Sequence, residues 1–275
     1  MKNLFLIAKM DIKESLRSKW FLIYTLTFAG IIAIFFLSGV TNSRIAGFTG
    51  LTRLLLLFIQ ICFIILPIFI LITTVRSISY DRDMNTLEYL LSYPISLKEY
   101  YFGKAFGRGV VVFLPLLLAF GLIVIIGVVK GLSIPWGIII LYTLLLSALS
   151  FVFLAFGFLI SSIVKSQEMS LAMAFFVWLF FLAFLDLGLI GLMMRSSINE
   201  YLIYTFAILN PIQTFRVASM SLFDPNLSVI GPAAYYILDI FGRKTFMLYS
   251  LLYPAVLGII CLILGYVAFA KKDLV

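Results

Sequence analysis

Long runs of apolar residues constrain this chain more than any other feature of its sequence. A helix that crosses a bilayer needs about 20 apolar residues, and six runs come close to or exceed that length. We expect transmembrane helices at residues 20–38, 54–75, 109–129, 137–160, 169–194 and 245–270. A membrane β-barrel would instead show short strands of alternating hydrophobicity. The fold class is therefore predicted to be an all-α integral membrane protein, with one transmembrane domain over residues 1–275.

The composition supports a membrane protein and excludes a soluble one. Only 12% of the residues are charged and 64% are hydrophobic, whereas about 25% are charged in a typical soluble domain. In a membrane protein the net charge of +8 does not indicate nucleic-acid binding. The distribution of Lys and Arg between the two sides of the membrane instead indicates the orientation of the chain. With the N-terminus in the cytoplasm, 13 of the 20 Lys and Arg lie inside. The positive-inside rule therefore predicts cytoplasmic N- and C-termini in an inner or plasma membrane.

Two segments outside the spans also have the character of helices. Residues 1–19 repeat apolar side chains every four residues, next to a basic stripe, and are expected to form an interfacial amphipathic helix. The repeat consists of Leu4, Ala8, Ile12 and Leu16. This helix either only anchors the chain or acts as a lever on the first span. Residues 195–243 form the longest predicted outer segment, and their short apolar pieces suit re-entrant or interfacial helices.

The polar insert YDRDMNTLEYLLSYPIS at residues 80–96 separates the second and third predicted spans. Asn85 is expected to cap a short helix, with Glu88 three residues later. The apolar face of that helix is predicted at Leu87, Leu90, Leu91 and Pro94. Pro94 should end the helix, and Ser96 with Glu99 should cap a second helix that leads into the membrane.

A helix of two turns is unstable alone in water, so the insert must pack against something. Its leucine face lies either on the inner ends of this chain or in a groove of a cytoplasmic partner. In the second case a charged rim would set the specificity of binding. The candidate rim residues are Asp81, Arg82, Asp83 and Glu88.

Six spans, an amphipathic N-terminal helix and an acidic insert that runs into TLEYLLSYPIS resemble the ABC-2 type permeases over nearly the whole chain. In that family the insert carries a coupling helix that docks on a separate ATPase subunit, and two permeases work with two ATPases. The resemblance implies docking at Asp81, Arg82, Asp83, Thr86, Leu87, Glu88, Leu90, Leu91, Tyr93 and Pro94. Three segments look most like the membrane subunits of transporters for nitrous oxide reductase maturation: GFTGLTRLLLL, RDMNTLEYLLSYPISLKEYYFGKAFGRG and LNPIQTFR.

The sequence itself contains no ATP-binding motif. No G-x-x-x-x-G-K-[ST] pattern is present, and GKAFGRG at 103–109 is glycine-rich only superficially, because it follows no strand. We expect no cofactor in this chain, with ATP and Mg²⁺ bound by the partner. The chain also lacks histidine and the H-E-x-x-H and G-x-S-x-G motifs, so an intramembrane enzyme is disfavoured.

Gln60 and Asp186 are polar residues inside predicted spans, where burial of an ionisable group is costly. Both side chains could form a hydrogen bond with a neighbouring helix. Asp186 could instead lie on a substrate or proton path. The second reading of Asp186 is the basis of the alternative function, an ion-coupled secondary transporter or channel. Such proteins usually contain inverted repeats, and none is evident here.

Resemblance to a maturation transporter raises the question of copper, which as Cu(I) prefers Cys and Met ligands. Cys62, Cys261 and nine Met are available, but no C-x-x-C or Met-rich cluster occurs, and no metal site is predicted. An extracytoplasmic accessory protein could handle the metal instead. Its contact is expected in the outer segment, at Asn210, Pro211, Phe215 and Arg216.

Overall fold

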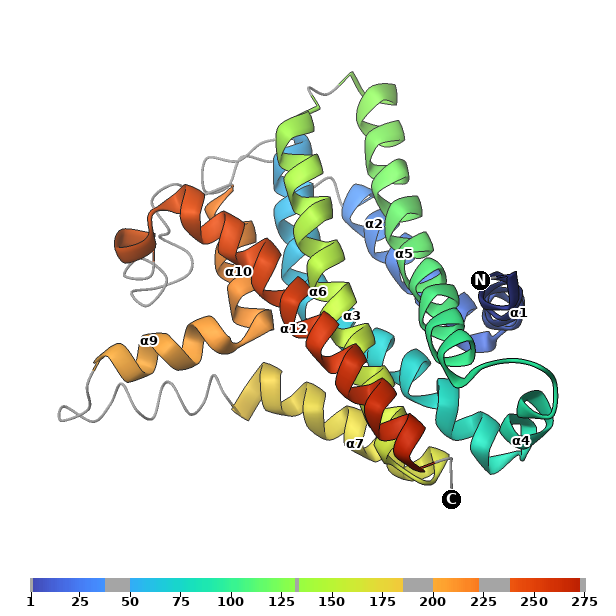
Figure 1. Ribbon diagram of the computed structural model, residues 1–275. Coiled ribbons are helices and arrows are strands. Elements are labelled where there is room, and N and C mark those ends of the chain that lie inside the picture. The colour runs from blue at the N-terminus through green and yellow to red at the C-terminus, as the bar shows by residue number, and fades with distance from the viewer. Residues whose placement is uncertain (1, 38–49, 132–133, 185–199, 223–237, 273–275) are drawn as a thin grey trace.

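The computed structural model describes residues 2–37, 50–131, 134–184, 200–222 and 238–272, and within these ranges it contains helices and no strand. The predicted all-α fold class is confirmed. In chain order the helices are α1 (Lys2–Leu16), α2 (Lys19–Leu37), α3 (Gly50–Asp83), α4 (Thr86–Leu91), α5 (Leu97–Val129), α6 (Trp136–Ile163), α7 (Gln167–Leu179), the π-helical turn η1 (Phe180–Phe184), α9 (Glu200–Leu209), α10 (Pro211–Ser221) and α12 (Arg243–Lys272) (Figure 1).

Five helical stretches in the described ranges are long and apolar enough to cross a membrane: α3, α5, α6, α7 with η1, and α12. The pair α1 and α2, bent by 66°, adds a sixth if it is taken as one span. Helices α3 and α5 exceed the predicted apolar runs by the most. The second span continues in α3 to Asp83, and the third begins in α5 at Leu97. The last part of the predicted fifth span, residues 185–194, lies outside the described residues.

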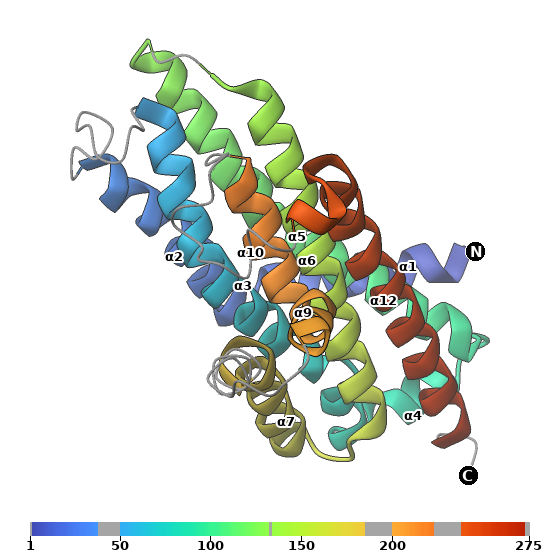
Figure 2. The ribbon, with the colours of Figure 1, turned by 90° about the vertical axis from the view of Figure 1, so that its left-hand side faces the viewer.

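The long helices α3, α5, α6 and α12 run side by side (Figures 1 and 2), and α6 packs against both α3 and α12. A row of contacting aromatic rings crosses this bundle. Phe28 of α2 meets Phe58 of α3, and Phe58 meets Phe120 of α5, with ring centroids 5.9 and 6.1 Å apart. Tyr142 of α6 then contacts Phe120 at 5.5 Å and Phe215 of α10 at 5.9 Å. Five helices thus share one aromatic core, whose edge-to-face pairs add stability beyond the area they bury.

The N-terminal helix α1 lies across the first turns of α5, in contact with its backbone. Two glycines allow this approach. A Cβ atom placed on Gly103 would lie 2.9 Å from the carbonyl oxygen of Leu4, and one on Gly107 would lie 2.7 Å from that of Ala8. Small residues spaced four apart are a common means of bringing helix backbones together in membrane proteins.

The buried face of α1 differs from the face predicted by its leucine repeat. The most buried side chains in the helix are Ile7, Ala8, Asp11 and Ser15, whereas Leu16 is 39% exposed. Ala8 of the predicted stripe is buried and Leu4 and Ile12 are partly buried, so the buried face is displaced from the predicted one by less than one residue's rotation and excludes Leu16. The reason is that α1 packs against α5, where Arg108 binds the Asp11 carboxylate. The spacing of apolar residues alone cannot predict such a polar contact.

The bend between α1 and α2 is fixed by Ser18. Its Oγ donates to the carbonyl oxygen of Ser15 at 2.7 Å and accepts from the backbone N–H of Phe21 at 3.1 Å. One side chain thus satisfies groups at the end of α1 and at the start of α2, as a capping serine does. Helices α1 and α2 are consequently joined by an ordered bend.

Replacing Gly107 by Leu should destabilise the protein by about 1–3 kcal/mol, because an inserted side chain must push the α1 backbone off α5. The matched control is Gly121→Leu on the same helix, where a Cβ atom would meet nothing within 4 Å. The measurement is the thermal unfolding temperature in detergent. Equal unfolding temperatures for the two variants would show that the α1–α5 contact contributes little to stability.

Candidate functional site

The insert at residues 80–96 forms a compact corner at the α1 end of the bundle, built from the end of α3, the short helix α4 and an elbow that leads into α5. Helix α3 ends because Asn85 adopts the left-handed conformation, with φ 54° and ψ 15°. Asparagine tolerates this conformation better than most residues other than glycine. The predicted role of Asn85 as a side-chain cap of α4 is wrong, because its side chain makes no capping bond.

The second predicted cap is confirmed and begins α5. Ser96 Oγ accepts from the backbone N–H of Glu99 at 3.2 Å, and the Glu99 carboxylate accepts from the backbone N–H of Ser96 at 3.3 Å. This reciprocal pair is a complete capping box. Pro94 lies in the elbow between α4 and α5, outside both helices. The Asn3 side chain of α1 donates to its carbonyl oxygen at 3.2 Å.

Helix α4 turns Leu87 and Leu90 inward and Tyr89 outward, whereas the Leu91 side chain lies outside the described part of the structure. Leu87 is buried and Leu90 packs partly against the same core. Thr86 and Glu88 are exposed, and Tyr89 is 64% exposed. Of the two sequence alternatives for the leucine face, the structure therefore shows packing on the chain itself at Leu87 and Leu90.

The exposed side of the insert is aromatic. Tyr89 and Tyr93 are 64% and 50% exposed, their hydroxyls lie 2.9 Å apart and their rings meet edge to face at 5.5 Å. The hydrogen bond with Tyr89 raises the pKa of Tyr93. Met84, 59% exposed, lies at the turn before α4. We call Met84, Glu88, Tyr89 and Tyr93 the insert surface.

Three consecutive residues at the end of α3 reach three different elements. The Asp81 carboxylate pairs with Lys104 of α5, and Arg82 Nη1 donates to the carbonyl oxygen of Val164 after α6 at 2.8 Å. The Asp83 carboxylate accepts from the backbone N–H of Gln167, the first residue of α7, at 2.7 Å. From the sequence, these three side chains were predicted to form part of a charged rim that faces a partner. The structure uses them to tie α3 to its neighbours, and Asp81 is only 5% exposed.

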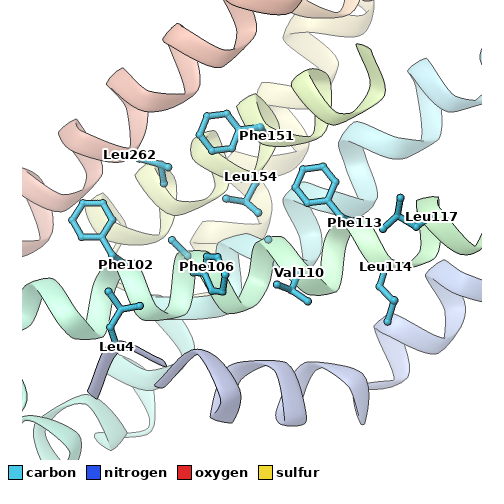
Figure 3. A pocket seen from close by; sticks show the side chains of 12 residues that line it. Leu4, Phe102, Phe106, Val110, Phe113, Leu114, Leu117, Phe151, Leu154 and Leu262 are labelled. Carbon is cyan, nitrogen blue, oxygen red and sulfur yellow. The ribbon is translucent and has the colours of Figure 1, made fainter. Parts of the chain in front are cut away.

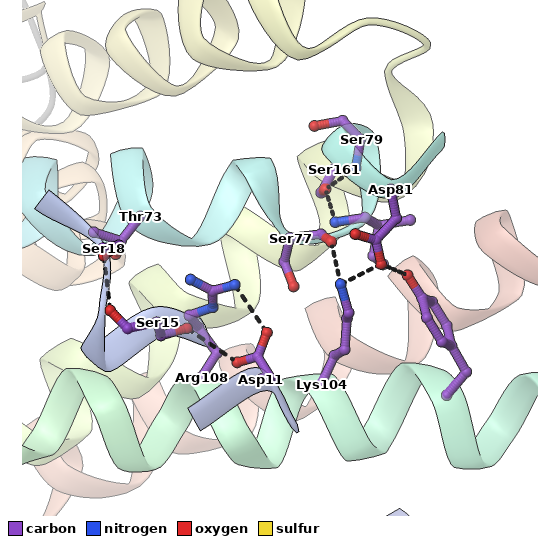
Figure 4. Close-up of polar contacts among 12 residues, drawn as sticks. Asp11, Ser15, Ser18, Thr73, Ser77, Ser79, Asp81, Lys104, Arg108 and Ser161 are labelled. Atoms are coloured by element: carbon purple, nitrogen blue, oxygen red, sulfur yellow. Dashed lines mark hydrogen bonds and ion pairs between the residues drawn. The ribbon is translucent and has the colours of Figure 1, made fainter. Parts of the chain in front are cut away.

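The pair of Asp81 and Lys104 is buried and completed by two further groups (Figure 4). The Tyr100 hydroxyl donates to the Asp81 carboxylate at 2.5 Å, and Lys104 Nζ donates to the carbonyl oxygen of Ser77 at 2.8 Å. Both side chains are 7% exposed. A buried ion pair holds its charges only when such extra bonds satisfy the remaining lone pairs and protons.

A second ion pair, one turn further along α5, ties down α1. Arg108 Nη2 donates to the Asp11 carboxylate at 2.9 Å, and the Asp11 side chain is fully buried (Figure 4). Ser15 Oγ contacts the other oxygen of the same carboxylate at 3.5 Å. Sequence reasoning missed Asp11, Lys104 and Arg108. For Lys104 and Arg108 the only available signal was a charge in a segment that also contains closely spaced glycines, and for Asp11 it was an acidic residue in a mostly basic N-terminal segment.

A cavity of about 580 Å³ separates α1 from the insert surface. Leu6 and Met10 of α1 line one wall, and Tyr89, Tyr93 and Pro94 line the other. Glu14 and the two buried acids Asp11 and Asp81 also border it. The cavity is therefore mostly apolar with carboxylates in its wall, next to the most exposed aromatic side chains of the insert.

The predicted intramembrane and outer residues occupy different environments. Gln60 Nε2 lies 4.0 Å from Met220 Sδ of α10, a long contact between two helices, whereas Asp186 lies outside the described residues. Asn210 is buried: its Oδ1 accepts from the backbone N–H of Ile212 at 2.9 Å and its Nδ2 donates to the carbonyl oxygen of Phe181 at 2.8 Å. Asn210 therefore caps α10 and ties it to η1.

The expectation of an outer-partner contact at Asn210, Pro211, Phe215 and Arg216 needs correction. The first three side chains are buried and offer no surface to another protein. Arg216 is partly buried, with its guanidinium 5.9 Å from the Phe63 ring centroid. These residues hold α10 against the bundle. In the described ranges no three His, Cys, Asp or Glu side chains gather in a way that could hold a metal ion.

Comparison with known proteins identifies relatives over most of the chain. The family model described as "ABC-2 family transporter protein" matches residues 5–274. The chain is similar to a "Probable ABC transporter permease protein NosY" of Stutzerimonas stutzeri, 27% identical over 237 residues that cover 84% of this chain and 86% of the relative. A protein of the same description from Pseudomonas aeruginosa is 25% identical over 233 residues, covering 82% and 84%.

The buried pair provides a direct test of the network at this corner. Asp81→Asn and Lys104→Met should each destabilise the protein by about 3–5 kcal/mol, because each leaves one uncompensated buried charge. The double variant should be less destabilised than the sum of the two single variants, and unfolding in detergent measures all three. Strict additivity would mean that the two charges do not interact, and it would contradict the role given to the pair.

Proposed function

The chain belongs to the ABC-2 transporter family, and we propose that it is the permease subunit of an ABC transporter whose ATPase subunits are separate polypeptides. It is a multi-pass protein of the cell membrane, with several apolar helices long enough to cross the bilayer. The observation that carries the proposal is the exposed insert surface on a rigidly tied corner, in a sequence without an ATP-binding loop. ATP and Mg²⁺ are then bound by the partner, and this chain is a non-catalytic subunit.

We propose that the ATPase contacts the insert surface and the adjoining cavity. Tyrosine is among the residues that contribute most to protein–protein binding, and Tyr89 and Tyr93 make no described side-chain hydrogen bond except with each other. Leu87 and Leu90 hold α4 to the chain from behind. A docked partner therefore meets a helix that is already folded, and binding does not have to provide the free energy of ordering α4.

Movement of the docked insert is then passed to the spans by the polar ties of the corner. Asp81 connects α3 to α5 through Lys104, and Asp83 connects α3 to the first residue of α7. The Asn3 bond to Pro94 links α1 to the elbow. We propose that closure of a pair of ATPases pushes the insert, and that α1, α3 and α5 move with it. The spans would reorganise against a second copy of this chain.

We further propose a role in nitrous oxide reductase maturation, in which the transporter serves assembly of the copper site. The support is the similarity of the chain to the two NosY permeases and the resemblance of three segments to maturation transporters. An extracytoplasmic accessory protein would receive the motion or the cargo. Its contact would involve parts of the outer segment other than the buried residues of α10.

The double variant Tyr89→Ser, Tyr93→Ser should abolish copurification of the ATPase from native membranes, with at least a tenfold loss of bound partner. The two tyrosines contact only each other by hydrogen bonding, so the chain should still fold. The matched control is Trp136→Ser, an exposed aromatic residue (57%) at the start of α6. Partner recovery is measured by quantitative mass spectrometry of the gently solubilised complex.

Full recovery of the ATPase with the double variant would contradict docking at the insert surface. Loss of the ATPase with both the double variant and Trp136→Ser would also contradict it, because the effect would then not depend on the insert.

Deletion of this chain in its native host should leave nitrous oxide reductase synthesised but without its full copper content, and nitrous oxide should accumulate. Reduction of nitrate and nitrite serves as the control and should continue. Gas chromatography of nitrous oxide and metal analysis of the purified reductase are the measurements. Normal nitrous oxide reduction in the deletion strain would exclude the maturation role, and the permease proposal would be judged separately by the ATPase experiment.

A further inference from the structure

A second, larger cavity opens on the opposite side of α5 from the polar network. It has a volume of about 620 Å³ and runs along α5 from Phe102 to Leu117 (Figure 3). Leu154 of α6 and Leu262 of α12 line its far side, and Leu4 of α1 closes one end. We call this cavity the α5–α12 groove.

The chemistry of the groove selects a hydrocarbon ligand. Every residue that lines it is Gly, Ala, Val, Leu or Phe, so a polar group placed there would have no side-chain partner and would pay the full cost of leaving water. The walls are exposed at Phe106 (54%) and Val110 (41%), and the floor is formed by the buried Leu154. The volume lies within the range of about 300–1,000 Å³ that is typical of ligand sites.

The groove is longer than the hydrocarbon of one leaflet of a bilayer. From Phe102 to Leu117 helix α5 rises about 22 Å, whereas the hydrocarbon of one leaflet is about 15 Å thick. The groove therefore extends from the membrane interface into the leaflet. The groove begins beside the interfacial helix α1 and ends in the middle of a membrane-spanning helix. A chain that enters at the level of α1 would therefore run inward along α5.

A cationic side chain stands at the α1 end of the groove. Lys98 is exposed and lies four residues before Phe102 in the continuous helix α5, so the two side chains share one face, one turn apart. A lysine in this position complements the phosphate of a lipid whose chain lies in the groove. The charge of Lys98 and the apolar lining of the groove together indicate an anionic lipid as the ligand.

We propose that the α5–α12 groove binds one acyl chain of an anionic phospholipid, with the headgroup at Lys98. The lipid bridges α1, α5, α6 and α12, and it fills a space that the side chains of this chain leave open. Gly109 lies in the wall of the groove, where a Cβ atom would make only ordinary contact, 3.9 Å from Leu154 Cδ1. A larger side chain at this position enters the groove without displacing a helix.

The test uses the full chain reconstituted in vesicles of phosphatidylcholine and phosphatidylglycerol, with a trace of phosphatidylglycerol that carries a photoreactive diazirine in one acyl chain. After irradiation, mass spectrometry should find the label on the α5 peptide that spans residues 102–117. Gly109→Leu should reduce this labelling at least fivefold. The control Gly121→Leu adds the same side chain to α5 at an open position outside the groove, and its labelling should equal that of the unmodified chain.

A second variant, Val110→Trp, fills the groove from its exposed wall and should also reduce labelling. If both filling variants are labelled like the unmodified chain, the groove holds no acyl chain and the proposal is overturned. Equal labelling by a phosphatidylcholine probe would overturn the assignment of an anionic headgroup. Disulfide formation between two Val110→Cys chains in the membrane would show that a second copy covers the groove.

Discussion

The buried ion pair between Asp81 and Lys104 is the interaction on which the corner of α1, α3, α4 and α5 depends. Two charges that are 7% exposed are tolerated only together, because separating them leaves an unpaired charge out of water. Tyr100 and the Ser77 carbonyl complete the set of bonds, which makes the arrangement stiffer than a single contact. The helices α3 and α5 therefore cannot part at this level without a large cost.

Different faces of helix α5 make different kinds of contact. One face carries Lys104 to α3 and Arg108 to α1, and Gly103 and Gly107 bring the α1 backbone close enough for the second pair. Another face is wholly apolar and borders the α5–α12 groove, beginning at Phe102. The ion pairs and the proposed lipid-binding groove thus lie on different faces of α5, so a ligand in the groove need not disturb the ion pairs.

Apart from the cap predicted at Asn85, the sequence was sufficient for features that depend on near neighbours in the chain. The apolar runs predicted the five helical stretches that are long enough to cross a membrane, and Ser96 with Glu99 predicted the cap of α5, because both signals are local in the sequence. It failed where a distant partner decides. Asp81 was assigned to an exposed rim because its partner lies 23 residues away, and Asn210 was assigned to an outer surface although it caps α10 and bonds η1. Asn85 ends one helix by its backbone instead of capping the next by its side chain.

Helices α3 and α5 are long enough to extend from the corner into the membrane. These helices contain 34 and 33 residues, whereas about 20 residues cross the hydrocarbon, so each has several turns beyond it. Those turns hold the ion pairs, and a push on α4 acts on helix ends that are already joined. Each helix also contains one interior proline, Pro67 in α3 and Pro115 in α5, where a backbone hydrogen bond is missing and bending costs least. In the proposed mechanism, a displacement of the corner would therefore be carried rigidly up to these prolines, and the helices would change their packing beyond them.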